Sequence, residues 1–426
     1  MNKAEQIVYN VLKKNAYAKL FVRNVYQSIF DLIPVKKCIS KYKITAREGH
    51  FFGFHDKSPY SADNQFLLSN KYHTNLKMPT KDDYLTLGVF KGNNHEDFIP
   101  LTKTYAWNWH QGCMLQWKGK EHSFVFNDAD KNTLVTKVFN MENETIQTIP
   151  APIGAVSPDG KHAVGYNFSR VFRYMTGYGY MQGVDPEIKL KQPNNTGLYY
   201  VNLDSGQVNH LFSIKEIASI TPESSMKDSY HYFSHCLFSP SSQRFVFMHR
   251  WVKSAEKQNQ RWSRLISCDI NGDNIYIFPT TEMVSHIAWK NESQILAYSR
   301  MPKLGDKYFL FRDQSPMDFE IIGESAFNSD GHPSFSPNKK WIVTDTYPNR
   351  TRQQYLILYN LQNQQRINIA KLKHPKKYTS LSHTKHWSCD LHPRWDRAGR
   401  YLSFDSVYTG VRALCSIDLN NINFNH

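Results

Sequence analysis

One phrase returns seven times along the chain: a short turn, often Ser-Pro, followed by a strand of alternating apolar residues. The copies begin at Ser58, Leu115, Ser157, Ser239, Ile287, Ser336 and Pro393. A repeat of roughly 40–60 residues built from short strands is typical of a β-propeller with one copy per blade. We therefore predict an all-β, seven-bladed β-propeller over residues 45–420. Loops from all blades of such a disc meet near one axis, where a ligand site is expected.

Residues 1–40 follow a different pattern, because apolar residues recur there at three- and four-residue spacing among lysines and arginines. We predict a basic amphipathic helix before the propeller. Two placements remain open: on an anionic membrane face, or packed against the disc. The first residues lack an apolar signal-peptide core and no stretch reaches membrane-spanning length, so we expect a cytoplasmic protein, with any peripheral contact at the inner membrane.

The composition favours a polyanionic partner. The formal net charge is +15, and the chain contains 25 Tyr, 26 Phe and 9 Trp. Excess positive charge attracts polyanions, but no nucleic-acid-binding signature is present, so nucleic acid is not expected. Aromatic rings stack on sugar faces and arginine binds carboxylates, which favours an acidic polysaccharide or oligosaccharide. No glycine-rich phosphate loop or serine-nucleophile elbow occurs, and no nucleotide cofactor is expected.

Three histidines and one cysteine stand just before blade strands in the later repeats. They are His235, His332, Cys389 and His392. Equivalent positions on different blades face one another near the axis, and three imidazoles with one thiolate make a tetrahedral set suited to Zn²⁺. We predict a metal site, structural in character because four protein ligands leave no open position. The alternative is that each histidine forms only a local hydrogen bond.

The earlier repeats carry residues suited to β-elimination on a uronic acid. Such a reaction needs a group that neutralises the carboxylate, a base for the C5 proton and an acid for the leaving oxygen. We assign proton transfer to His110, Tyr174 and Tyr232. The predicted substrate-binding residues are Asn127, Arg170, Arg173, Arg250, Tyr178 and Trp109. The absence of an evident carboxylate pair argues against a glycosidase, and ordinary packing remains the alternative for each residue.

Longer phrases strengthen this interpretation. FFGFHDKSP, WNWHQGCMLQW, NFSRVFRYMTGYGY, HCLFSPSSQRFVFMHRW, GHPSFSPNKKWIVTDTYP and CDLHPRWDRAGRYLSFDS, spread over roughly residues 48–420, resemble the seven-bladed propeller polysaccharide lyases. These include the ulvan lyases and, more distantly, oligogalacturonate lyase.

The resemblance implies β-elimination of a uronate-containing polysaccharide at a His/Tyr centre, with a separate metal held by histidine and cysteine. His110 then matches the first catalytic imidazole and Tyr174 the catalytic tyrosine, whereas Asn127 or Asp128 stands where ulvan lyases have a second imidazole. We expect a lyase-like protein of capsule or exopolysaccharide metabolism. The alternative is a non-catalytic glycan-binding or polysaccharide-assembly propeller.

Overall fold

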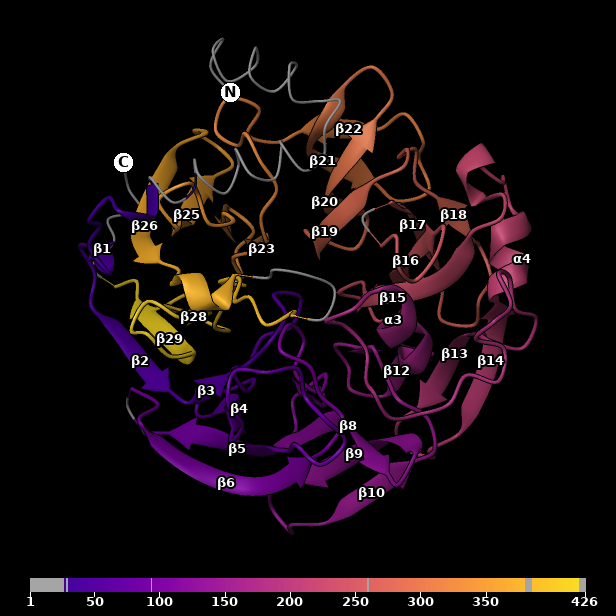
Figure 1. Cartoon of the computed structure of the whole chain (residues 1–426), viewed down its shortest axis with the longest axis horizontal. Coiled ribbons are helices and arrows are strands. Elements are labelled where there is room, and N and C mark those ends of the chain that lie inside the picture. The colour runs from indigo at the N-terminus through magenta and orange to yellow at the C-terminus, as the bar shows by residue number, and fades with distance from the viewer. Residues whose placement is uncertain (1–26, 28–29, 93, 259, 380–384, 421–426) are drawn as a thin grey trace.

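Seven antiparallel sheets form a ring around a central axis in the computed structural model, within its described residues: 27, 30–92, 94–258, 260–379 and 385–420 (Figure 1). The predicted all-β, seven-bladed propeller is confirmed. Five of the sheets consist of four consecutive strands, and the other two add a strand from the beginning of the chain. Other contacts between residues far apart in sequence lie at the axis and between neighbouring blades.

The strands of each blade are ordered from the axis outward. The first four blades are β3 (His50–Phe51), β4 (Leu67–Tyr72), β5 (Leu85–Lys91), β6 (Asp97–Thr104); β7 (Gln116–Trp117), β8 (Ser123–Asp130), β9 (Thr133–Asn140), β10 (Ile146–Ile149); β11 (Ala155–Val156), β12 (His162–Tyr166), β13 (Gly197–Asn202), β14 (Val208–Ser213); and β15 (Tyr230–Phe238), β16 (Arg244–Val252), β17 (Arg261–Asp269), β18 (Tyr276–Ile277). The last three blades are β19 (Val284–Trp289), β20 (Gln294–Met301), β21 (Gly305–Arg312), β22 (Phe319–Ile321); β23 (Ser334–Phe335), β24 (Trp341–Asp345), β25 (Gln353–Asn360), β26 (Arg366–Lys373), β1 (Cys38–Ser40); and β27 (Arg394–Trp395), β28 (Tyr401–Ser406), β29 (Ala413–Asp418), β2 (Ile44–Glu48). Helices α3 (Phe168–Tyr174) and α4 (Ile214–Ser219) and the 3₁₀ turns η1 (Ser224–Met226) and η2 (Lys376–Tyr378) lie in the connections.

The ring is closed by strands from the beginning of the chain. β2 pairs with β29, placing Ala46 opposite Cys415, and β1 pairs with β26, placing Ile39 opposite Lys371. The last blade therefore takes its outermost strand from the first part of the chain. The seventh sheet is complete only when β2, from the beginning of the propeller, pairs with β29 at its end.

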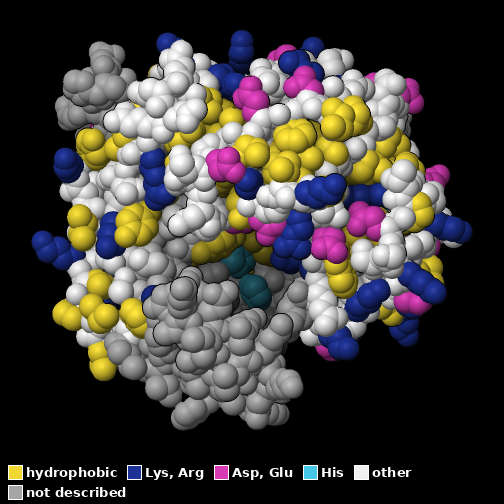
Figure 2. Space-filling model, turned by 90° about the horizontal axis from the view of Figure 1, so that it is seen from above, with side chains coloured by type: hydrophobic (Ala, Val, Ile, Leu, Met, Phe, Trp, Pro, Cys, Tyr) yellow, Lys and Arg dark blue, Asp and Glu magenta, His cyan; other side chains and the backbone are white. Residues whose placement is uncertain are grey.

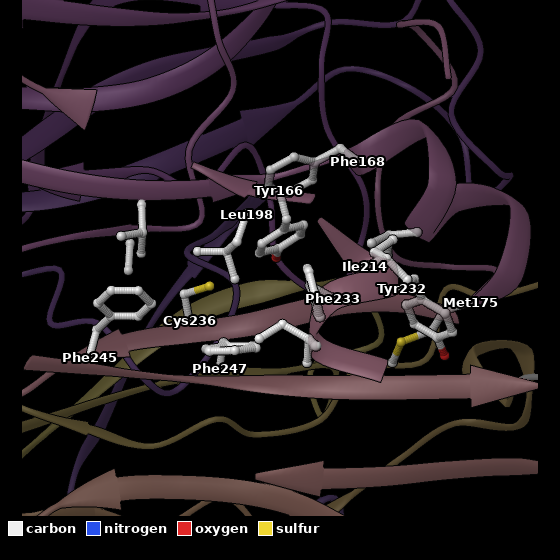
Figure 3. Close-up of a cluster of buried hydrophobic side chains, with 14 of the residues drawn as sticks. Tyr166, Phe168, Met175, Leu198, Ile214, Tyr232, Phe233, Cys236, Phe245 and Phe247 are labelled. Atoms are coloured by element: carbon white, nitrogen blue, oxygen red, sulfur yellow. The ribbon is translucent and has the colours of Figure 1, made fainter. Parts of the chain in front are cut away.

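The core lies between neighbouring blades. In the cluster of Figure 3, Leu198 of the third blade lies with Phe233, Cys236, Phe245 and Phe247 of the fourth. Successive side chains of a strand point to opposite faces of its sheet. Because neighbouring blades stack face to face, both faces of a central strand are covered and apolar. Continuous burial along β16 follows from this stacking.

The repeated Ser-Pro turns lie between the first and second strands of their blades. In three of them the fourth residue of the turn donates its backbone N–H to the serine carbonyl: Gly160 to Ser157, Ser242 to Ser239 and Lys339 to Ser336. Because neighbouring strands are antiparallel, these turns share one face of the disc, which we call the turn face. Loops that lead into the innermost strands reach the opposite face, which we call the loop face.

Residues 1–26, 28 and 29 of the predicted amphipathic helix of residues 1–40 lie outside the described residues. Of the rest, Gln27, Phe30 and Asp31 are helical, whereas Cys38–Ser40 form strand β1. Among the described residues, no helix is both long and apolar enough to cross a membrane.

Candidate functional site

Histidines occur within or just before four consecutive innermost strands, β15, β19, β23 and β27. Each is followed three residues later by an aromatic residue: His235–Phe238, His286–Trp289, His332–Phe335 and His392–Trp395. The His332 ring centroid lies 4.0 Å from that of His286 and 4.3 Å from that of His392. The predicted histidines are thus brought together. His286 was missed, although its spacing to an aromatic residue is the signal shared by the other three.

The two closest candidate ligands are oriented by their own hydrogen bonds. His332 donates Nδ1–H to the Asp345 carboxylate at 2.8 Å, and His392 donates Nδ1–H to the Gly53 carbonyl at 2.8 Å. Asp345 also accepts the backbone N–H groups of His332 and His392, at 2.8 and 3.0 Å. Both rings therefore keep Nε2 available, and the buried Nε2 of His392 has no partner among the described residues. A carboxylate that holds imidazoles in this way is typical of metal sites.

A carboxylate completes this group. One ligand atom each from His332, Asp390 and His392 lie within 4.8 Å of one another. Burial raises the pKa of Asp390 to about 6, although His332 acts in the opposite direction. Two imidazoles and a carboxylate fit a divalent cation of the borderline to hard class, such as Mn²⁺ or Zn²⁺.

Cys389 is placed differently from the prediction. Its side chain packs with Tyr378 and Val407, and its Sγ lies 3.8 Å from the Asp390 carbonyl oxygen. Burial raises the pKa of the thiol to about 12, which keeps it protonated. A protonated thiol is a poor metal ligand. The structure therefore offers the Asp390 carboxylate where the sequence suggested a thiolate.

Two of the clustered histidines have backbone conformations that are uncommon for residues with a side chain. φ is +55° at His235 and +45° at His392, and a bulge interrupts β15 between Ser234 and Leu237. A second bulge lies at His286, between Val284 and Ile287. Such strain and bulges concentrate at functional sites, where they aim side chains.

Tyr178 connects this cluster with His110. It stands between Gly177 and Gly179, whose φ angles are +92° and +70°, and a Cβ on Gly179 would lie 2.3 Å from a backbone oxygen of Phe168. Only glycine fits such positions, so the sequence GYG fixes the loop. The Tyr178 ring stacks on His110, with centroids 4.9 Å apart, and lies 5.8 Å from the His235 ring.

His110 is a buried imidazole stacked on Tyr178. It is buried, and neither ring nitrogen has a hydrogen-bond partner among the described residues. Its loop is held by the Asn108 side chain, which accepts the backbone N–H groups of His110 and Gln111. Burial, followed by the neighbouring His386 and Arg412, lowers the pKa of His110 well below its ordinary value. The imidazole is therefore neutral around pH 7.

The other two tyrosines assigned to proton transfer lie elsewhere. The Tyr174 hydroxyl donates to the Ile188 carbonyl at 2.6 Å, and its ring stacks on Tyr230. Tyr232 is fully buried in the core, near Met175 (Figure 3). Tyr178 is thus the tyrosine that the structure places on His110.

Two predicted carboxylate-binding residues have their polar groups occupied by the protein. Arg170 is fully buried, pairs with Asp185 at 3.0 Å and donates to backbone carbonyls of residues 187, 190, 191 and 231. The Asn127 side chain bonds to Ile153, Tyr180 and Thr136. Both residues hold loops in place, because a buried side chain with all partners supplied has little left to offer a ligand.

Arg250 remains the best placed of the predicted cations. Its Nε–H donates to Ser234 Oγ at 3.0 Å, and the same hydroxyl contacts His235 Nδ1 at 2.8 Å. Burial, followed by Arg261, lowers the pKa of Arg250 to about 10, which leaves it charged at neutral pH.

The last two predicted residues, Arg173 and Trp109, lie in different surroundings. Arg173 is exposed and lies 3.7 Å from Glu256. Trp109 donates Nε1–H to the Lys77 carbonyl and packs under the Arg412 guanidinium, so it supports the loop from within the core.

A cavity of about 560 Å³ adjoins Tyr178, a size typical of small-ligand pockets. Its lining includes Tyr105, Trp107, Phe172, Arg173 and Met181. Figure 2 shows histidine side chains within a hollow of the molecular surface. Stacking surfaces and one arginine beside a histidine cluster suit a sugar ring.

Fold and site together define a propeller with a histidine–carboxylate cluster on its axis. No protein-family model matches the sequence, and no curated protein matches it. Solved structures do match. Oligogalacturonate lyase from Vibrio parahaemolyticus is 12% identical, with 91% of this chain and 99% of that chain covered and a TM-score of 0.60.

Two further structures show the same architecture. An oligogalacturonate lyase in complex with manganese is 11% identical over 91% of this chain and 99% of its own, with a TM-score of 0.61. The β-propeller domain of the trilobed protease from Pyrococcus furiosus is also 11% identical over 91% and 99%, with a TM-score of 0.50. At such identities the matches establish a shared fold.

Proposed function

We propose that this protein is a metal-dependent lyase that cleaves a uronate-containing acidic saccharide by β-elimination. The observation that carries the proposal is the group of His332, Asp390 and His392, with Asp345 and Gly53 holding the two rings so that Nε2 stays available. The shared fold with two oligogalacturonate lyases, one solved with manganese, supports it. When bound there, a divalent cation would neutralise a substrate carboxylate and make the adjacent C5–H more acidic.

The residues around Tyr178 supply the proton transfers. Neutral His110 takes the C5 proton, the C4–C5 double bond forms, and the C4–O bond breaks. Burial raises the pKa of Tyr178 to about 12, so its phenol is protonated at neutral pH and can protonate the leaving oxygen. Two neighbouring groups with opposite protonation preferences are the arrangement that acid–base catalysis requires. Arg250 balances the carboxylate charge beside His235.

The test is an elimination assay on a panel of uronate polymers and oligosaccharides. The expected result is ultraviolet absorbance of the unsaturated uronate product, lost when a chelator removes divalent cations and restored by manganese or zinc. His332→Gln removes one imidazole Nε2 that would ligate the metal, and this variant should lose activity. Lys340→Gln on the turn face should keep it. Binding of a uronate oligosaccharide without product would instead favour the glycan-binding alternative. Activity insensitive to both chelator and His332→Gln would contradict the proposal.

A further inference from the structure

A basic patch lies on the rim of the disc, where strand β1 from the beginning of the chain pairs with β26. Residues 32–43 and 371–377 each contain four lysines and no aspartate or glutamate. The pairing of Ile39 with Lys371 brings these two distant segments side by side. β1 is the outermost strand of its sheet and lies at the perimeter of the disc (Figure 1). We call the two segments together the rim patch.

The strand register places lysines beside one another at this edge. Residues directly opposite each other in an antiparallel pair point to the same side of the sheet, as do residues two apart along a strand. Lys371 and Lys373 therefore share a side with Ile39, which is opposite Lys371. Lys37 lies next to Lys373, because its carbonyl accepts the Lys373 backbone N–H. The closure of the ring thus concentrates charge that the sequence keeps far apart.

Little of this charge is neutralised within the protein. Asp31, just before the first segment, lies 3.7 Å from Lys376 and accepts a hydrogen bond from Arg352 at 2.6 Å. Arg352 lies outside the rim patch and balances that carboxylate. The other seven lysines of the patch form no ion pair with a carboxylate among the described residues. The patch therefore keeps its positive charge for a partner.

The rim patch also exposes aliphatic side chains. The exposed fraction is 83% at Leu32, 45% at Ile33 and 48% at Ile39. Such side chains gain free energy when they enter the boundary between lipid headgroups and acyl chains. A hydrated polysaccharide or a nucleic-acid backbone would leave them in water. Lysines together with exposed aliphatic residues therefore favour a lipid surface over another polyanion.

The preceding part of the chain has the same character in its sequence. Residues 1–26 lie outside the described residues, and they contain five lysines and arginines against one glutamate. The apolar spacing of this segment predicts a basic amphipathic helix, which is a typical membrane-surface element. Since this segment leads directly into the rim patch, 26 further residues are available to extend the same contact.

We propose that the rim patch docks this protein on an anionic lipid bilayer, with its lysines against the headgroups and Leu32, Ile33 and Ile39 at the acyl boundary. Each lysine near such a surface contributes about 1 kcal/mol of attraction, and four to eight together are typical of segments that bind anionic lipids. Because the patch lies on the rim, the histidine cluster on the axis takes no part in the contact.

Cosedimentation of the full chain with lipid vesicles tests this. The vesicles contain phosphatidylcholine with about one third phosphatidylglycerol, or phosphatidylcholine alone. Chelator is present throughout, so that no metal ion bridges the protein to lipid phosphates. We expect binding to the anionic vesicles, weakening as salt screens the lysines, and at least about tenfold weaker binding to phosphatidylcholine alone.

Two triple variants with the same change in net charge separate the rim patch from general basicity. Lys37→Gln, Lys371→Gln and Lys373→Gln combined should weaken binding at least about tenfold. The control combines Lys120→Gln, Lys161→Gln and Lys303→Gln, exposed lysines of the second, third and fifth blades, and should weaken it by less than about threefold. No binding to anionic vesicles, or equal effects of the two triple variants, would overturn the proposal.

Ile39→Thr tests the apolar part of the contact, because it keeps a β-branched residue in the strand and removes apolar surface. It should weaken vesicle binding about threefold. Unchanged binding in Ile39→Thr would indicate a purely electrostatic contact and contradict a bilayer as the partner. A rim patch that binds polygalacturonate but not vesicles, with the first triple variant losing that binding, would likewise overturn the proposal. None of these outcomes depends on whether the axial site is a lyase centre.

Discussion

Tyr174 and Tyr178 lie four residues apart in one insertion, yet their hydroxyl groups face different surroundings. That of Tyr174 bonds to the Ile188 carbonyl, whereas the Tyr178 ring lies on His110 and its hydroxyl has no hydrogen-bond partner among the described residues. The sequence identified the aromatic insertion but could not choose between them, because the choice depends on the positive φ angles of Gly177 and Gly179. The sequence assigned Tyr178 only to substrate binding, whereas we propose a role for it in proton transfer.

This difference predicts opposite results for two conservative substitutions. Tyr178→Phe removes the proposed acid and should lower the maximal rate by about 100-fold or more, with little change in KM. Tyr174→Phe removes only a bond to a carbonyl and should change the rate by no more than about tenfold, with a loss of stability of about 1 kcal/mol. Steady-state rates of product formation measure both. If Tyr174→Phe lost more rate than Tyr178→Phe, Tyr174 rather than Tyr178 would be the proton donor.

The histidines show how far residue-level prediction reaches. His235, His332 and His392 were chosen because each precedes a repeat strand, and the ring geometry brings them to one cluster. Cys389 was chosen for its spacing to His392, but alternation along the chain turns its side chain into the core and Asp390 toward the rings. Asp345, which orients both ligands, carries no local signal because its contacts are long-range.

At the scale of elements, the connection from β12 to β13 is held by Arg170. This arginine joins α3 to the segment 185–191 through Asp185 and backbone carbonyls. The sequence suggested that Arg170 binds substrate, because arginine in an aromatic loop is typical of sugar sites. Its complete burial instead makes it a structural residue.

Arg170→Met should therefore destabilise the insertion. Removing one member of a buried ion pair leaves Asp185 and several carbonyls unsatisfied, and we expect a loss of about 3–5 kcal/mol in the free energy of unfolding. Chemical denaturation measures this loss, and limited proteolysis should show cleavage within residues 167–196. The exposed Arg173→Met is the control and should change stability by less than about 0.5 kcal/mol. If Arg170→Met weakened substrate binding and left stability unchanged, the predicted role of Arg170 in substrate binding would be supported instead.

The fourth blade contains a chain of hydrogen bonds that makes stability depend on pH. Arg264 Nε–H donates to His249 Nδ1 at 3.1 Å, and His249 Nε2 lies 2.8 Å from His231 Nδ1. Since arginine only donates, His249 donates onward, and His231 directs its remaining N–H to the Met226 carbonyl. An extra proton on either ring would place two N–H groups against each other. Both imidazoles are therefore neutral in the folded protein.

Burial lowers the pKa of His231 to about 4 from its ordinary value of 6.5. Below pH 6.5 the unfolded chain binds this proton and the folded protein does not, so stability falls as the pH falls from 6.5 towards 4. This group alone should remove about 3 kcal/mol over that window. Urea unfolding measured across this pH range should show the slope, and His231→Gln should flatten it. An identical slope in the variant would contradict this origin.

For the whole molecule, the seven repeats predicted the seven blades because each blade is a local unit with its own turn. The closure by β1 and β2 was not predicted, since those strands pair with the far end of the chain and have no repeat signal of their own. Convergence on the axis is likewise a property of the ring. It brings loops from the second, third, fourth, sixth and seventh blades around one point.

The central claim is that this axis carries a divalent-metal site formed by His332, Asp390 and His392. Titration of chelator-treated protein with manganese or zinc, followed by metal analysis after gel filtration, tests it most directly. We expect one ion per chain, at least about tenfold weaker binding in Asp390→Asn and His332→Gln, and unchanged binding in Cys389→Ser. Loss of the ion in Cys389→Ser with retention in Asp390→Asn, or no bound metal at all, would contradict the account.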